Sequence, residues 1–105
     1  MSFVTTHVLD TAAGKPAEGL KVTMTSQDGE TVAAGVTNSD GRISNFGPDT
    51  LASGTYTIRF DVANYYPDTS FFSSVGLTVN LDENAGHYHI PLLLSPYSIS
   101  SYRGS

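Results

Sequence analysis

Short runs of alternating apolar and polar residues, separated by turn dipeptides, constrain this chain most strongly. Turn signals recur along its 105 residues, at Asp28-Gly29, Asp40-Gly41, Gly47-Pro48, Ser53-Gly54 and Ala85-Gly86. A side-chain period of two between such turns is typical of β-strands, whereas the 3.6-residue period of amphipathic helices is nearly absent. The pattern predicts an all-β sandwich or barrel that forms a single domain over residues 1–105.

Five of the alternating runs each present one apolar face, and we expect these faces to form the core. Their inward residues are Val4, Thr6 and Val8; Leu20, Val22 and Met24; Tyr56, Ile58 and Phe60; Val75, Leu77, Val79 and Leu81; and Tyr88, Ile90, Leu92 and Leu94. A sixth strand is expected over residues 97–103, and residues 32–36 and 42–46 add two more. About eight strands are enough for two stacked sheets. A single helical turn is expected within residues 61–68.

Composition limits the partners of this chain. A domain of this length without cysteine buries only about 65% of the surface of its unfolded chain, which favours oligomerisation. Ten acidic and five basic residues give a net charge of −5, which argues against nucleic acid and anionic membrane surfaces as partners. Neither end carries a targeting signal, and no stretch approaches the roughly 20 apolar residues of a membrane span. A cytoplasmic location is therefore expected.

All three histidines fall on the opposite face from the predicted core. If Val8 and Ile90 point inward, then His7, His87 and His89 point outward, together with Pro91. A sheet face that carries histidine and proline indicates an interface or a pocket wall rather than an ordinary solvated surface. Proline also removes one ladder hydrogen bond, so an edge position, a bulge or a local irregularity is expected at Pro91.

Histidine changes charge near neutral pH, so these positions are candidates for proton transfer, although a single strand histidine is more often a packing or surface residue. His87 and His89, together with His7, also suggest a three-histidine zinc site, but no acidic partner is evident near the pair. Arg42 follows the Asp40-Gly41 turn, which suits a guanidinium that recognises a carbonyl or carboxylate group. No Gly-x-Ser-x-Gly motif and no phosphate-binding loop is present.

Five motifs together resemble a known family. They are HVLDT from His7, GKPA from Gly14, TNSDGR from Thr37, HYHIPLLLSP from His87, and YRGS from Tyr102 to Ser105. The chain resembles the transthyretin-related proteins, the 5-hydroxyisourate hydrolases, over essentially its whole length. The resemblance implies a transthyretin-like (prealbumin-like) two-sheet β-sandwich of about eight strands with one short helix. It also implies a homotetramer whose dimer–dimer interface forms a channel that contains the active sites.

The same resemblance implies hydrolysis of 5-hydroxyisourate to 2-oxo-4-hydroxy-4-carboxy-5-ureidoimidazoline (OHCU), a step of urate catabolism, without a cofactor and with no metal assigned. Carried over residue by residue, it gives catalytic roles to His7, Arg42, His89 and Ser105, and substrate-binding roles to His7, Arg42, Tyr102 and Arg103. Either His7 or His89 would accept the proton of the attacking water while Arg42 stabilises negative charge, and the choice of base stays open. The alternative is a transthyretin-like carrier of small molecules, such as hormones, without catalysis.

Overall fold

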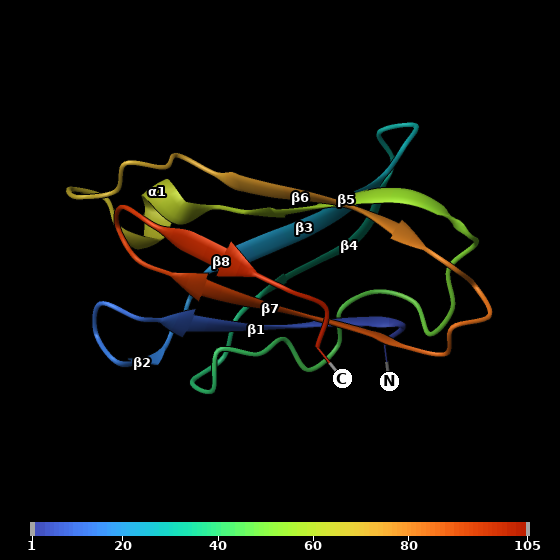
Figure 1. Cartoon of the computed structure of the whole chain (residues 1–105), viewed down its shortest axis with the longest axis horizontal. Helices are drawn as coiled ribbons and strands as arrows, with labels where there is room; N and C mark the ends of the chain where they lie inside the picture. Colours follow the sequence, from blue (N-terminus) through green and yellow to red (C-terminus); the bar gives the residue numbers. More distant parts are fainter. Residues whose placement is uncertain (1, 105) are drawn as a thin grey trace.

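A computed structural model describes residues 2–104 as two four-stranded sheets packed face to face (Figure 1). The first sheet has the order β2-β1-β7-β8, from β2 (Lys15–Pro16), β1 (Val4–Asp10), β7 (Tyr88–Leu94) and β8 (Ile99–Ser101). The second has the order β4-β3-β5-β6, from β4 (Thr31–Val36), β3 (Lys21–Ser26), β5 (Gly54–Phe60) and β6 (Val75–Leu81). One helical turn, α1 (Val62–Tyr65), follows β5. The predicted two-sheet sandwich with one short helix is confirmed.

The core lies between the sheets and is built from the predicted inward faces. In β1, buried and half-buried residues alternate without a break, as the period of two requires. Thr6 is polar yet only 1% exposed, because its hydroxyl donates to the carbonyl of Ile90 at 2.7 Å. Within the described part of the chain, no helix is long and apolar enough to span a bilayer.

The pairing of β1 with β7 brings the two ends of the sequence together. These strands run parallel, with Thr5 in register with His89 and His7 in register with Pro91, whereas the other strand pairs are antiparallel. Because register fixes which side chains share a face, the histidines of β1 and β7 lie on the same outer surface.

The prediction of a strand over residues 42–46 is wrong. Only Arg42 pairs there, in an isolated bridge with His7, and the N–H of Phe46 donates to the Ser2 hydroxyl at 2.6 Å instead of a ladder partner. Ile43 and Phe46 are both buried but three residues apart, a spacing that does not fit a strand. The eighth strand is instead the two-residue β2, which pairs with Leu9 and Asp10.

The final strand is also shorter than the predicted residues 97–103. The β7–β8 ladder pairs Leu92 with Ser101, and the same register continues to an isolated bridge between His89 and Gly104. Pro91 lies between these pairs and has no N–H to donate, so the ladder is interrupted there. The irregularity expected at Pro91 is confirmed, although the strand that carries it is central rather than an edge.

Candidate active site

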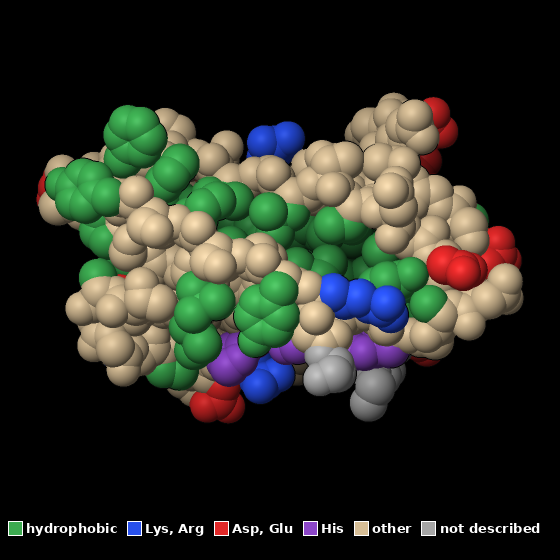
Figure 2. Space-filling view, in the orientation of Figure 1, with side chains coloured by type: hydrophobic (Ala, Val, Ile, Leu, Met, Phe, Trp, Pro, Cys, Tyr) green, Lys and Arg blue, Asp and Glu red, His purple; other side chains and the backbone are tan. Residues whose placement is uncertain are grey.

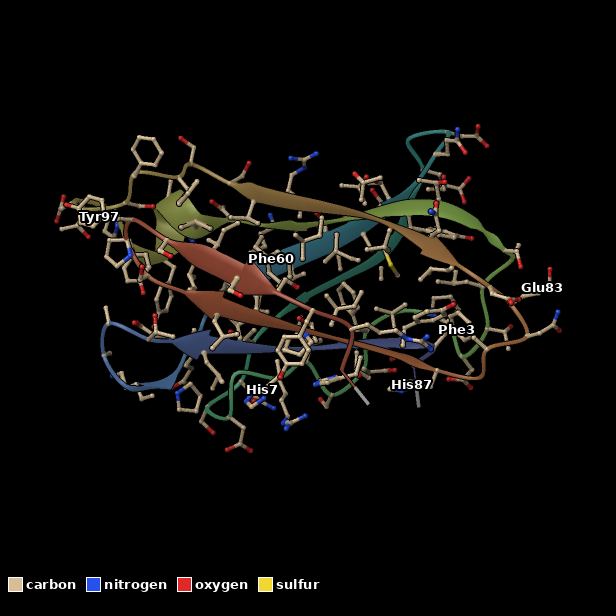
Figure 3. All side chains as sticks on the ribbon, viewed as in Figure 1. Phe3, His7, Phe60, Glu83, His87 and Tyr97 are labelled. Carbon is tan, nitrogen blue, oxygen red and sulfur yellow. The ribbon has the colours of Figure 1, made fainter. Side chains whose placement is uncertain are left out.

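The outer face of the first sheet collects the residues that could carry chemistry. His7 on β1 and His89 on β7 are half-buried, and the bridge between His7 and Arg42 places the guanidinium-bearing residue beside His7. His7 and His87 lie on the side of this sheet away from Phe60, which fills the core (Figure 3). Figure 2 shows the histidines along the lower edge of the molecule, with a basic side chain beside them. The expected convergence of His7, Arg42 and His89 on one face is present in a single chain.

A tight turn holds Arg42 in place. The Asn38 side-chain oxygen accepts from the N–H groups of Asp40 and Arg42, and the Asn38 N–H donates to the Arg42 carbonyl at 2.7 Å. Gly41 has a positive φ of 75°, and its carbonyl accepts from the Val8 N–H at 2.8 Å. A Cβ at residue 41 would collide with the Val8 carbonyl oxygen, so only glycine lets the turn lie this close to β1.

A hydroxyl that the sequence analysis did not single out connects two of the imidazoles. Thr5 Oγ1 lies 2.8 Å from His89 Nδ1 and 3.2 Å from His87 Nε2. Thr5 shares the outward face of β1 with His7, two residues away, and this spacing is the only signal in the sequence. Its contact with His89 depends on the parallel register between strands that are far apart in the chain.

The surroundings of His89 favour its neutral form. Burial lowers the pKa of His89 below its ordinary value, because the charged imidazole loses hydration there, and the positive charges of Arg42, His7 and His87 lower it further. An imidazole that stays neutral near pH 7 keeps a lone pair for accepting a proton. The outer face of the first sheet therefore combines a proton acceptor, the His89 imidazole, with a permanent cation, the Arg42 guanidinium.

The C-terminal segment reaches His89 from the other side. The Gly104 N–H donates to the His89 carbonyl at 2.7 Å, and a Cβ at residue 104 would lie 2.7 Å from Cδ2 of the imidazole. Glycine is therefore needed here because the ring lies directly against the backbone. Tyr102 is 60% exposed and is one of the residues that line the groove beside β6.

Two other predicted site residues are not placed on this face. The Arg103 guanidinium stacks 4.2 Å from the centroid of the Tyr88 ring, and both residues line the groove between β6 and β7. Tyr88 belongs to the inward face of β7, so one chain does not bring Arg103 to the histidines. Ser105 lies outside the described residues.

The three imidazoles are not arranged as a metal site. Within residues 2–104, no three His, Cys, Asp or Glu side chains form a group that could hold a metal ion. His87 and His89 instead direct one ring nitrogen each toward the same threonine hydroxyl. The three-histidine zinc site considered from the sequence is not formed.

Comparison with known proteins gives the family. A family model described as "HIUase/Transthyretin family" matches residues 4–104. The 5-hydroxyisourate hydrolase of Deinococcus radiodurans is 43% identical, over 97% of this chain and 95% of that protein. The structure of Klebsiella pneumoniae 5-hydroxyisourate hydrolase matches with a TM-score of 0.89 at 34% identity, over 99% of this chain and 100% of that one. Sea bream transthyretin in complex with thyroxine matches with a TM-score of 0.90 at 26% identity, over 97% and 94% of the two chains. The chain belongs to the HIUase/Transthyretin family.

Proposed function

We propose that this protein is a 5-hydroxyisourate hydrolase, which opens the six-membered ring of its substrate at an amide-like C–N bond to give OHCU. The observation that carries the proposal is the convergence of His7, His89 and Arg42 on one outer sheet face. Near-full-length similarity to proteins named as this hydrolase supports the same activity.

In the proposed mechanism, His89 is the general base. Its depressed pKa keeps the imidazole neutral near pH 7, so it can take a proton from water as the water oxygen attacks the scissile carbonyl carbon. The same proton can then pass to the ring nitrogen as the C–N bond breaks, which completes the hydrolysis without a cofactor. His7 lies on β1, two residues beyond Thr5, which is in register with His89. In this mechanism His7 binds the substrate and orients the water.

Arg42 is the proposed electrophilic residue. A guanidinium is always charged and presents a planar fork of donors, so it can hold a substrate carbonyl and stabilise the oxyanion that forms on attack. The turn built on Asn38 fixes its backbone before substrate arrives. Tyr102 would close the pocket and form a hydrogen bond with the substrate ring. The C-terminal Ser105 keeps the catalytic role that the family resemblance gives it.

A carrier function is the alternative, because the fold alone does not separate the two activities. Sea bream transthyretin, solved with thyroxine, has nearly the same TM-score as the Klebsiella pneumoniae hydrolase. Two histidines and an arginine make the outer face polar and able to transfer protons, which favours catalysis. Equilibrium binding of thyroxine without hydrolysis of 5-hydroxyisourate would support the carrier instead.

We further propose that the protein works as a homotetramer in the cytoplasm. β6 and β8 are edge strands of the two sheets, and a groove of ≈ 410 Å³ with apolar residues such as Leu77 and Val79 opens between them. Figure 2 shows hydrophobic side chains exposed in the middle of this face. Unpaired edges and an apolar groove suit pairing with a second copy, and two such pairs could then enclose the histidine faces. The lack of cysteine fits a reducing compartment.

The activity is tested by generating 5-hydroxyisourate from urate with urate oxidase and following its decay by absorbance. Wild-type protein should accelerate the decay. His89→Asn should lower kcat by about 10²–10⁴-fold, as expected for loss of a general base, and Arg42→Ala by about 10²-fold or more.

Arg59→Ala is the matched control for Arg42, because Arg59 is an exposed arginine on the second sheet, and it should keep the wild-type rate. The proposal is wrong if wild-type protein leaves the decay unchanged. The residue assignment is wrong if folded His7→Asn, His89→Asn and Arg42→Ala proteins all keep the wild-type rate.

A further inference from the structure

We propose that Thr5 is a positioning residue that sets the tautomer of His89, so that Nδ1 carries the proton and Nε2 presents its lone pair to substrate and water. This inference rests on the proposed hydrolase function. It adds a residue that the family motifs did not point to and it assigns the basic nitrogen.

The hydrogen-bonding capacity of a threonine hydroxyl limits the possible arrangements. The hydroxyl has one proton to donate and two lone pairs to accept, while two imidazole nitrogens lie within 3.2 Å of it. In the proposed arrangement, His89 Nδ1–H donates to Thr5 Oγ1, and the Thr5 hydroxyl donates to Nε2 of His87. All three groups are then satisfied while each remains neutral.

The opposite arrangement would place a proton on His89 Nε2. That N–H would add positive polarity to a face already occupied by the Arg42 cation, whereas a lone pair there is attracted to it. His87 is exposed, so water can form hydrogen bonds with either of its tautomers. His87 therefore does not determine the tautomer of His89. The charge of Arg42 therefore favours the direction in which Thr5 accepts from His89, and the Thr5 hydroxyl holds the proton on Nδ1.

Gly104 supports the same orientation from the other side of the ring. Thr5 on β1 contacts Nδ1, and the backbone at Gly104 lies against Cδ2, so the ring is held between the two neighbours of β7. Neither contact involves Cε1 or Nε2 of the ring. In the proposed arrangement, these two contacts hold the ring so that Nε2 remains available to accept a proton from water.

The charged and titratable groups that act on His89 are Arg42 from the turn after β4, His7 from β1 and His87 from the residue before β7. None of these groups forms a hydrogen bond with the His89 ring in residues 2–104, whereas Thr5 Oγ1 lies 2.8 Å from its Nδ1. During catalysis, water would lose a proton to Nε2, and the Nδ1–H bond to Thr5 would stabilise the resulting imidazolium.

The test compares Thr5→Val, which keeps the shape but loses the hydroxyl, with Thr5→Ser, which restores it. Long-range ¹H–¹⁵N spectra of the substrate-free proteins report the tautomer of His89. We expect the Nδ1–H form in wild type and Thr5→Ser, and a mixture of tautomers in Thr5→Val. In the coupled assay, Thr5→Val should lower kcat by roughly 10–100-fold with KM changed by less than about twofold.

The pH profile provides a readout that a purely structural role would not move. A hydroxyl that accepts from the imidazolium favours the charged form, so its loss in Thr5→Val should shift the acidic limb of kcat/KM to lower pH. Thr57→Val is the matched control, because it removes a threonine–threonine hydrogen bond of 3.0 Å on the second sheet, far from the histidines. It should leave kcat and the pH profile unchanged.

The proposal is overturned if wild-type His89 carries its proton on Nε2, or if Thr5→Val keeps both the wild-type tautomer and the wild-type kcat. If Thr5→Val does not fold, the spectra of wild type and Thr5→Ser still report the tautomer of His89. If wild type is inactive in the coupled assay, the proposed function fails, whereas the tautomer spectra still decide the role of Thr5.

Discussion

Close packing around His89 decides residue identity at single positions. The ring lies against the backbone at Gly104, and its Nδ1 lies 2.8 Å from Thr5 Oγ1. At Gly41, the approach of the turn to β1 excludes a side chain in the same way. Neither glycine carries a reactive group, yet Gly104 fixes the His89 ring and Gly41 fixes the turn that carries Arg42. Residues of this kind are found from interatomic distances rather than from their chemical type.

We expect the pH dependence of hydrolysis to be set by a single residue, His89. Since burial and the nearby cations lower the pKa of His89, we expect kcat/KM to rise with pH through an apparent pKa below the ordinary histidine value of about 6.5, and to be level near pH 7. His89→Asn should remove this limb together with most of the activity. An acidic limb centred above about 6.5 would contradict the assignment of His89 as the base.

At the scale of elements, a buried carboxylate ties the β1–β2 turn to α1. Asp10, the last residue of β1, is 5% exposed and accepts from the N–H groups of Ala12 and Ala13 and from the Tyr65 hydroxyl at 2.8 Å. The buried Tyr66 hydroxyl has no partner within hydrogen-bond geometry in residues 2–104, but it lies near enough to Asp10 to help lower the pKa of that carboxyl. Burial opposes ionisation of Asp10, but these donors outweigh it and lower its pKa.

Asp10→Asn should therefore destabilise the protein by about 1–3 kcal/mol at pH 7, because an amide cannot replace all the acceptors of a buried carboxylate. A carboxylate whose pKa is lower in the folded state stabilises the protein above its unfolded pKa of about 3.9, and this contribution is lost as pH falls through the folded value. The stability difference between wild type and Asp10→Asn should shrink below about pH 4. Denaturant unfolding at one protein concentration measures it.

Asp28→Asn, in the exposed turn between β3 and β4, is the matched control and should change the unfolding free energy by less than about 0.5 kcal/mol. If Asp10→Asn and Asp28→Asn had equal stability at pH 7, Asp10 would not hold the turn to α1.

At the scale of the whole molecule, the two sheets leave their edges β6 and β8 on either side of an apolar groove. The histidine face lies on the outer surface of the first sheet, so pairing of two copies through the edges leaves it available to a second pair (Figure 3). A small sandwich without disulfides gains stability from burying such a groove. In the proposed tetramer, the groove joins two copies and the histidine faces lie where two such pairs meet.

Leu77→Asp, which puts a charge into the groove, should shift the protein from about four times 11.1 kDa toward smaller species in light scattering after size exclusion. Thr31→Asp adds the same charge to an exposed position of β4, at the opposite edge of the second sheet and outside the groove, and should keep the wild-type mass. Circular dichroism checks that both variants fold. A wild-type mass of a single chain, or equal masses for the two variants, would contradict assembly through this groove.

Alternation of residue types was enough to predict most strands, because burial of one face leaves a period of two in the sequence. Residues 42–46 were assigned wrongly and β2 was not predicted, because such short segments contain too few residues to show a period. Their hydrogen bonds go to distant partners such as the Ser2 hydroxyl and β1. The histidine face was predicted from alternation alone, Arg42 was singled out by the turn before it, and the family motifs joined the two in one site.

By itself, the sequence determined the sandwich, the outward histidines and the family, because each depends on local pattern or on motif. Only the tertiary structure decided that Thr5 contacts His89, that Gly104 packs against its ring, and that Arg103 stacks on Tyr88 away from the histidines. These contacts depend on the parallel register of β1 with β7 and on the interruption at Pro91. Register is set by the packing of the whole sandwich, and no local stretch of residues encodes it.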